Sequence, residues 1–311
     1  MEVVRKIAAT ACTVLYWVIL GATAGHAAEG GFSDYFPGAF GSFLVGVAPQ
    51  PGWTLANQTL IYGANVNRAV LDGRIDTHLK TFAVFDLLSA AYTADVPTLG
   101  GRFQLGGFLP VGHVSADFRT GNGSHDVSGS DFNIGDLGLV PASFFWDLGD
   151  FHIKAAELII APSGHYDVNQ KINVGRNYWA FDTELGLTWF NPGIGTEVSL
   201  LPGIMFNTEN EATNYRTGTE FHLDFMLNQF LSQSFAIGFQ GYYYKQISGD
   251  SGNGAVLGSF QGESVGIGPA VLWLPEFGQG NLSLVAKWLH DLEATNRLKG
   301  DYGQVTVAYR F

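Results

Sequence analysis

The sequence has almost no cysteine and few charged side chains. Cys12 is the single cysteine among 311 residues, and charged residues make up 14% of the chain, against about 25% in a typical soluble domain. Disulfide bonds therefore cannot hold this fold together. The charge is mainly acidic, with 28 Asp and Glu against 16 Lys and Arg. Because nucleic-acid binding needs clustered Lys and Arg to neutralise phosphates, the lack of a basic cluster argues against nucleic acid as a partner.

The first 27 residues have the layout of a secretory signal peptide. Arg5 and Lys6 precede an apolar run over residues 7–20, and small residues then lead to a cleavage site after Ala27. The alternative is an uncleaved membrane anchor, since residues 7–24 could just span a bilayer. The small residues at the expected distance favour the signal peptide, and its removal leaves an exported chain without cysteine.

Long hydrophobic runs are missing from the rest of the chain, although 46% of all residues are hydrophobic. No stretch after residue 27 reaches the roughly 18 apolar residues of a transmembrane helix. Apolar and polar residues instead alternate in segments bounded by Gly, Asn, Asp, Ser and Pro. Such segments predict strands at 53–66, 77–93, 101–116, 132–147, 151–163, 176–190, 195–208, 215–230, 233–247, 259–274, 281–292 and 301–311.

This alternation predicts an all-β fold, a transmembrane antiparallel β-barrel of about twelve strands formed by residues 53–311. The connections between the expected strands alternate between short and longer, more polar ones, as they do between the two ends of an outer-membrane barrel. We therefore expect the protein to lie in the bacterial outer membrane, with lipid around its outer face.

One face of each expected strand is polar and is assigned to the lumen. Glu220, His222 and Asp224 alternate with Phe221 and Leu223. A charged side chain that faces lipid near the midplane costs about 2–4 kcal/mol, so the charged row points inward. The same argument predicts a lumen-lining solute path that also includes Tyr178, Asp182, Glu184, Tyr242, Tyr244, Lys287 and Arg310.

The chain ends on an aromatic residue in an alternating strand. Val305, Val307, Tyr309 and Phe311 share one face. Because a closed barrel has no free edge, the last strand must pair with the first, which anchors Phe311 at the lipid interface. Tyr309 and Phe311 are predicted to form the signal that the outer-membrane barrel assembly machinery recognises.

Residues 28–52 precede the first expected strand and are rich in Gly, Phe and Pro. They form either a disordered periplasmic leader or a plug folded into the lumen. Tyr35, Phe36, Phe40 and Phe43 are costly to leave exposed to water, which favours the plug.

Three patterns suggest chemistry, and each has a simpler explanation. Residues 262–266 match G-x-S-x-G, but a nucleophile elbow needs a following helix and none is expected. The row of Glu220, His222 and Asp224 could perform acid–base or metal chemistry, but period two on a strand also produces an ordinary lumen lining. The Asp-rich loops 117–131 and 248–258 could bind Ca²⁺, without the spacing of an EF-hand. We predict no catalytic residue, no metal ligand and no cofactor.

Several longer motifs follow one another along the chain: EGGFSDYFPGAF, GDLGLVPASFFW, APSGHYD, GRNYWAFDTELGLTWFNPGIGTEVS and VGIGPAVLW. From residue 29 onward the chain resembles the outer-membrane family called "meta-pathway of phenol degradation", or sphingosine-inducible outer-membrane proteins. This resemblance implies an outer-membrane barrel associated with uptake of aromatic or long-chain hydrophobic compounds. It supplies no binding residues.

Together these features predict a channel or transporter for passive uptake of small hydrophobic or aromatic compounds. Its acidic lumen should favour cations and neutral solutes over anions. The alternatives are a hydrolase embedded in the barrel, which needs a Ser or a metal beside His222, and a structural or adhesive surface protein, for which the outer loops are short.

Overall fold

The computed structural model describes residues 33–66, 69–71, 74–76, 78–119, 127–256, 258–259, 261–278 and 281–311. The predicted signal peptide, residues 1–27, lies outside this part of the chain. Thirteen strands form one closed antiparallel sheet. They are β1 (Gly52–Val66), β4 (His78–Thr93), β5 (Arg102–Arg119), β6 (Val127–Ile134), β7 (Leu137–Leu148), β8 (Phe151–Ala161), β9 (Ala180–Asn191), β10 (Thr196–Asn207), β13 (Glu220–Ser232), β14 (Phe235–Gln246), β15 (Glu263–Trp273), β16 (Leu282–Thr295) and β17 (Lys299–Arg310).

The sheet closes into a barrel through its first and last strands. β1 pairs with β17 from Thr54 opposite Arg310 to Asn65 opposite Lys299, and with β4 on its other side. β6 and β7 both pair with β5 and follow each other along it, so they share one strand position. The fold is the predicted closed barrel of twelve strands.

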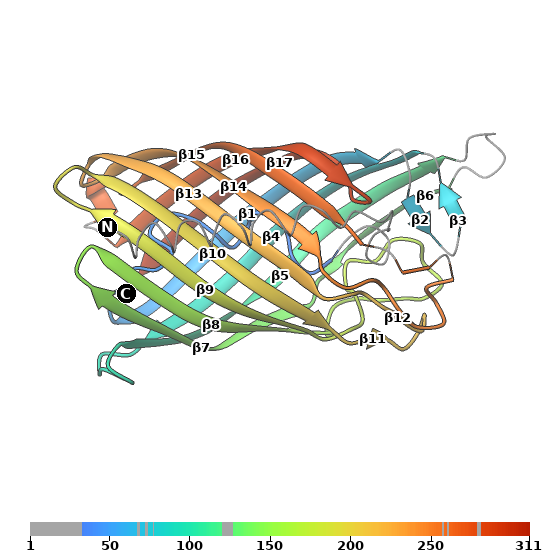
Figure 1. Ribbon diagram of the computed structural model, residues 1–311, viewed down its shortest axis with the longest axis horizontal. Coiled ribbons are helices and arrows are strands. Elements are labelled where there is room, and N and C mark those ends of the chain that lie inside the picture. Colours follow the sequence, from blue (N-terminus) through green and yellow to red (C-terminus); the bar gives the residue numbers. More distant parts are fainter. Residues whose placement is uncertain are drawn as a thin grey trace, which may run out of the picture.

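The two ends of the barrel differ, as Figure 1 shows. At one end the strands β7 and β8, β9 and β10, and β13 and β14 are joined by short turns, in which Gly149 and Gly195 adopt positive φ angles. The other end carries longer connections with two small hairpins, β2 (Ala69–Leu71) with β3 (Arg74–Asp76) and β11 (Glu209–Asn210) with β12 (Tyr215–Arg216). In outer-membrane barrels short turns face the periplasm and long loops face outward. We name the two ends accordingly.

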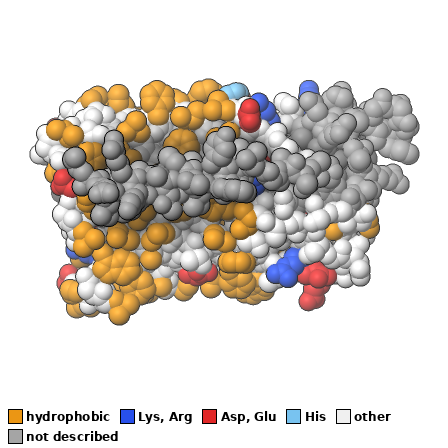
Figure 2. Space-filling view, viewed as in Figure 1, with side chains coloured by type: hydrophobic (Ala, Val, Ile, Leu, Met, Phe, Trp, Pro, Cys, Tyr) orange, Lys and Arg blue, Asp and Glu red, His pale blue; other side chains and the backbone are white. Residues whose placement is uncertain are grey.

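Side chains alternate between a buried inner face and an apolar outer face. In β9 every second residue is buried, beginning with Ala180 and Asp182, whereas Phe181 and Leu185 are exposed on the outside. Apolar side chains spread over the outer wall (Figure 2). Such an apolar outer surface is stable in contact with the hydrocarbon chains of membrane lipids. Among the described residues, no helix is long and apolar enough to cross a membrane.

Several predicted strands differ from the observed ones. The predicted strands 215–230 and 259–274 begin only at Glu220 and Glu263, and Tyr215 and Arg216 belong to the hairpin of β11 and β12. The predicted strand 132–147 is interrupted between β6 and β7 at Gly135 and Asp136, and the predicted strand 176–190 begins only at Ala180. Asp136 leaves the ladder because its carboxylate accepts the backbone N–H groups of Gly164 (2.8 Å) and Arg176 (2.5 Å). Residues 162–179 therefore run beside the interruption instead of extending β9.

Residues 33–51, which we call the N-terminal segment, run inside the barrel without joining the sheet. Their backbone bonds reach inward-facing side chains: Gly41 N–H donates to Asp224, Leu44 N–H to Glu197, and Gly46 N–H to Thr188. The segment thus follows the lumen from the loop end to the start of β1 at the periplasmic end.

Candidate functional site: the lumen and its N-terminal segment

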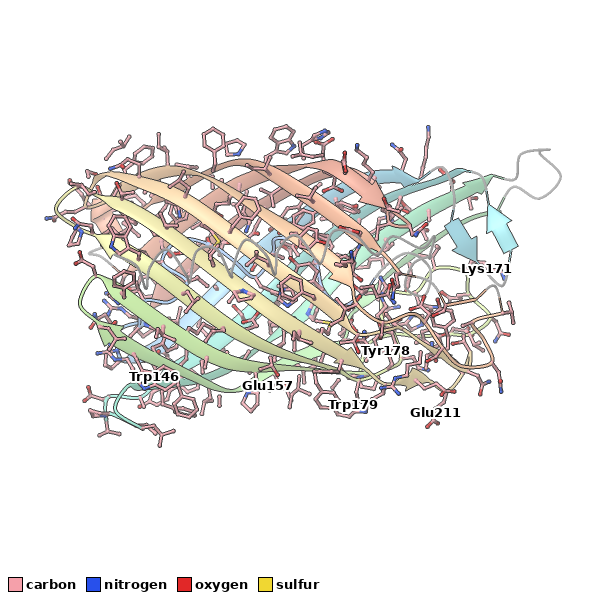
Figure 3. All side chains as sticks on the ribbon, viewed as in Figure 1. Trp146, Glu157, Lys171, Tyr178, Trp179 and Glu211 are labelled. Atoms are coloured by element: carbon pink, nitrogen blue, oxygen red, sulfur yellow. The ribbon has the colours of Figure 1, made fainter. Side chains whose placement is uncertain are left out.

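The predicted lumen-lining side chains are buried inside the barrel, with one exception at the rim. Tyr178 belongs to the connection before β9, and the others belong to strands of the wall. At most 6% of each is exposed for Tyr178, Asp182, Glu184, Glu220, His222, Asp224, Tyr242, Tyr244 and Lys287. In Figure 3 the side chains of the consecutive residues Tyr178 and Trp179 point in different directions, and Trp179 lies on the outer side of the barrel. Arg310 is half-buried at the periplasmic end, where its guanidinium donates to Asn281 Oδ1 (2.7 Å).

Lys287 holds the N-terminal segment through backbone oxygens. Its Nζ donates to the carbonyl oxygens of Gly38 (2.5 Å) and Gly41 (2.6 Å). The same turn of the segment is bound from the other side, because Gly41 N–H donates to Asp224 Oδ2 (2.6 Å). Hydrogen bonds with an ionised partner are the stronger ones, so one ammonium and one carboxylate hold residues 38–41 against the wall.

Close approach of backbone to wall explains a glycine at position 41. A Cβ added there would lie 2.6 Å from Asp224 Cβ and 2.9 Å from Met226 Sδ. At Gly38 the backbone has a φ of 71°, a conformation that favours glycine. The glycine-rich composition of the segment is thus needed for its contact with the wall.

Tyr35 is the most completely buried side chain of the segment. It is 0% exposed, and its ring stacks on His222, with centroids 4.2 Å apart, and on Tyr244, at 5.7 Å. Its hydroxyl donates to Asp224 Oδ1 (2.5 Å) and accepts the N–H of Gly38 (3.1 Å). The other aromatic residues of the predicted plug contact wall rings as well: Phe36 contacts Tyr62 and Tyr302, Phe40 contacts His222, and Phe43 contacts Phe230.

Several other charged side chains of the lumen interact with one another or with a tyrosine. His222 Nε2 lies 2.9 Å from both carboxylate oxygens of Asp182, and Lys154 Nζ donates to Glu184 (2.9 Å). Tyr244 donates to Glu220, and the guanidinium of Arg297 lies 3.7 Å from the centre of the Tyr244 ring.

Neither pattern considered for catalysis brings a serine and His222 together in the described part of the chain. His222 is bonded to Asp182, and none of the described hydrogen bonds joins it to a serine. Ser264, in the G-x-S-x-G match, lies within the strand β15 and precedes no helix. Among the described residues, no group of three or more His, Cys, Asp or Glu side chains is placed to hold a metal ion.

Several lumen residues are missing from the predicted set. Glu197, which accepts Leu44 N–H (2.7 Å), and Asp291, which accepts the hydroxyl of Tyr242, are both buried. Their position on the polar face of an alternating strand was a usable signal. Arg297 lies in the connection between β16 and β17, where strand alternation cannot predict which way a side chain points. Its position in the lumen is known only from its contact with Tyr244 in the structure.

Among the described residues, cavities lie between the N-terminal segment and the wall, and two of them matter here. The outer cavity has a volume of about 110 Å³ and is lined mostly by apolar side chains, including Phe36, Phe85 and Ile160, with Asp34, Asp136 and Arg176 among its polar groups. The inner cavity, about 230 Å³, is lined by Leu158, Val140, Lys154 and Glu184, among others.

The two cavities lie in series. Both are lined by Ala39, Phe40, Leu87 and Phe108. The outer cavity includes residues 173–176 of the long connection before β9, whereas the inner one includes Lys154, near the periplasmic start of β8. Together they follow the lumen along one side of the N-terminal segment, and the ring of Phe40 contributes to the lining of both.

The barrel, its apolar outer belt and its polar lumen define an outer-membrane β-barrel protein, and solved structures of similar fold agree. The chain is similar to the COG4313 outer membrane channel from Pseudomonas putida F1, with 15% identity and a TM-score of 0.70 over 89% of this chain and 100% of that one. It is also similar to the β domain of the Bordetella autotransporter BrkA (14% identity, TM-score 0.50, 84% of this chain and 100% of that one) and to the transport unit of the autotransporter AIDA-I from Escherichia coli (11%, 0.50, 88% and 95%).

Residues 62–307 match the family described as "Putative MetA-pathway of phenol degradation", and the chain belongs to this family. No curated protein sequence matches it. The fold and family place the protein in the bacterial outer membrane.

Proposed function

We propose that the protein is a passive outer-membrane channel for small, largely apolar molecules, including aromatic ones, and that it is not an enzyme. The observation that carries this proposal is the pair of cavities in series beside the N-terminal segment. The N-terminal segment acts as a plug, and the solute passes beside it through this narrow route.

The size and lining of the route set the class of solute. An apolar cavity of about 150 Å³ accommodates benzene in a protein core, and the two cavities here measure about 110 and 230 Å³. Aromatic and aliphatic side chains form most of the lining of both, so a hydrated ion or sugar would lose much of its water there and find few polar groups to replace it. Buried carboxylates along the lumen further disfavour anions.

Filling the outer cavity tests the proposal. Ala83 is 2% exposed and lines this cavity, whereas Ala90 on the same strand points to the outer face. Uptake of labelled toluene should be measured in cells, because a lipopolysaccharide outer leaflet, unlike a phospholipid bilayer, is a barrier to such solutes. We expect Ala83→Leu to reduce the initial rate several-fold towards that of cells without the protein, and Ala90→Leu to leave it unchanged. Equal rates in both variants, with equal amounts of folded barrel, would reject the route.

A further inference from the structure

The site that holds Tyr35 is built from wall residues, whereas Tyr35 is not part of the wall. His222 and Asp224 belong to β13 and Tyr244 to β14, and His222 lies directly opposite Tyr244 in the pairing of these strands. Tyr35 reaches them from a segment that makes no ladder with any strand. The wall therefore carries a preformed recess with an occupant supplied by another part of the chain.

The recess matches a phenol group in both shape and chemistry. Two rings, His222 and Tyr244, stack on the faces of the occupant, at interplanar angles of 21° and 7°. At its polar end Asp224 Oδ1 accepts the phenolic O–H, and the N–H of Gly38 donates to the phenolic oxygen of Tyr35. All three wall side chains are at most 1% exposed.

Selectivity for the hydroxyl follows from this burial. A ring without a hydroxyl would stack equally well but would leave Asp224 Oδ1 without its donor. A buried acceptor that loses its partner is costly, so the recess should discriminate phenols from plain arenes.

We infer that the recess formed by His222, Asp224 and Tyr244 is a binding site for phenolic solutes, which Tyr35 occupies when no solute is present. A phenol that enters the lumen competes with Tyr35, and displacement of Tyr35 loosens the N-terminal segment. This inference rests on the proposed function, because the solute must first reach the lumen.

Competition between Tyr35 and a free phenol sets the phenol concentration that is needed to occupy the recess. Tyr35 is tethered to the barrel through β1, and a tethered ligand has an effective concentration of the order of millimolar. A free phenol must therefore reach comparable concentrations in the intact protein, but should bind much more tightly once Tyr35 is removed.

The test is binding of 4-methylphenol, the analogue of the tyrosine side chain, to refolded protein, with toluene as the matched ligand without a hydroxyl. The variants are Tyr35→Ala, which empties the recess, and Phe43→Ala, which removes another aromatic side chain of the same segment, stacked on Phe230. We expect Tyr35→Ala to bind 4-methylphenol at least about tenfold more tightly than the wild type or Phe43→Ala, and at least about tenfold more tightly than toluene. Equal affinity for the two ligands, or equal affinity in the two variants, would overturn the inference.

A second readout uses the unaltered protein. Saturating 4-methylphenol should accelerate hydrogen exchange at residues 38–46, and toluene should not. If neither ligand, or both ligands equally, accelerates exchange, the inference fails even if Tyr35→Ala does not fold. Binding is measured apart from transport. If Ala83→Leu loses toluene uptake but the recess does not prefer 4-methylphenol, the proposed channel stands and only the phenol site is rejected. If the recess prefers 4-methylphenol but Ala83→Leu keeps normal toluene uptake, the proposed channel is rejected.

Discussion

Lys287, like Asp224, forms two hydrogen bonds with the N-terminal segment. It is 5% exposed, donates to two backbone oxygens, and interacts electrostatically with Asp224. Hydrogen bonds to a charged group contribute about 1.5–3 kcal/mol each. Loss of this one ammonium should therefore weaken the closed arrangement without touching the barrel ladder.

Replacing Lys287 with Met should make the lumen conduct ions more often. Met keeps the length of the side chain but cannot donate to Gly38 and Gly41, so we expect at least about tenfold more frequent opening in single-channel recordings. Lys245→Met is the control, because Lys245 pairs with Glu263 in a partly exposed ion pair away from the segment. Equal opening frequencies in the two variants would contradict the role assigned to Lys287.

The sequence predicts the direction of these side chains better than their contacts. Period two is enough to place Glu220, His222 and Asp224 on one face, because charge is costly towards lipid. It cannot predict that His222 meets Asp182, since that contact depends on the register across β9, β10 and β13. The contact between Tyr35 and Asp224 joins residues 189 positions apart and follows only from the folded segment.

At the scale of elements, the interruption between β6 and β7 is the main departure from an ideal barrel. At the interruption, the carboxylates of Asp131 and Asp136 form hydrogen bonds in place of the missing backbone bonds between strands. Asp131 accepts Val174 N–H (3.0 Å) and contacts His165, while Asp136 accepts the N–H groups of Gly164 and Arg176. The alternation over 132–147 gives no sign of this break, because its cause lies in a connection 28 and 40 residues away from Asp136.

Removing the carboxylate of Asp136 should release the connection beside it. We expect Asp136→Ala to raise hydrogen-exchange rates at residues 164–176 by about tenfold or more, since two bonds to a charged acceptor are lost. Asp150→Ala, at a periplasmic turn where Asp150 accepts from Asn191, is the comparison. Unchanged exchange at 164–176 would show that the connection is held by other contacts.

An outer loop should respond to pH through Asp250. Its carboxylate accepts from Tyr215, from Gly218 N–H and from Gln246, and burial raises the pKa of Asp250 to about 6. Because this pKa is higher in the folded loop than the 3.8 of an ordinary Asp, the proton stabilises the docked loop. That stabilisation is complete below about pH 4 and is lost as the pH rises through 6, and it amounts to about 2–3 kcal/mol.

Hydrogen-exchange protection at residues 248–256, corrected for intrinsic rates, should therefore be higher at pH 5 than at pH 7.5. Asp250→Asn should remove most of this difference, because the amide does not titrate. A wild-type loop that is protected equally at both pH values would disprove the assignment.

At the scale of the whole molecule, the closed ladder and the filled lumen are separate features. The ladder was predictable because the alternation of apolar and polar residues is local, and the number of strands and the closure of the barrel follow from it. At the closure between β1 and β17, Phe311 N–H donates to Trp53 O (2.8 Å), and Tyr309 and Phe311 face outward as predicted. The lumen was less predictable. Its filling by residues 33–51 depends on many contacts with inner side chains, for which composition supplied only the aromatic and glycine content.

In the proposed function, small apolar solutes pass through the lumen beside Phe40, which lines both the outer and the inner cavity. The most direct test is the initial rate of toluene uptake by cells that express the wild type, Phe40→Ala or Phe40→Trp at equal levels of folded barrel. Removing the ring joins the cavities and a larger ring separates them, so we predict the fastest uptake for Phe40→Ala and the slowest for Phe40→Trp. The same rate in all three proteins would contradict a route through these cavities.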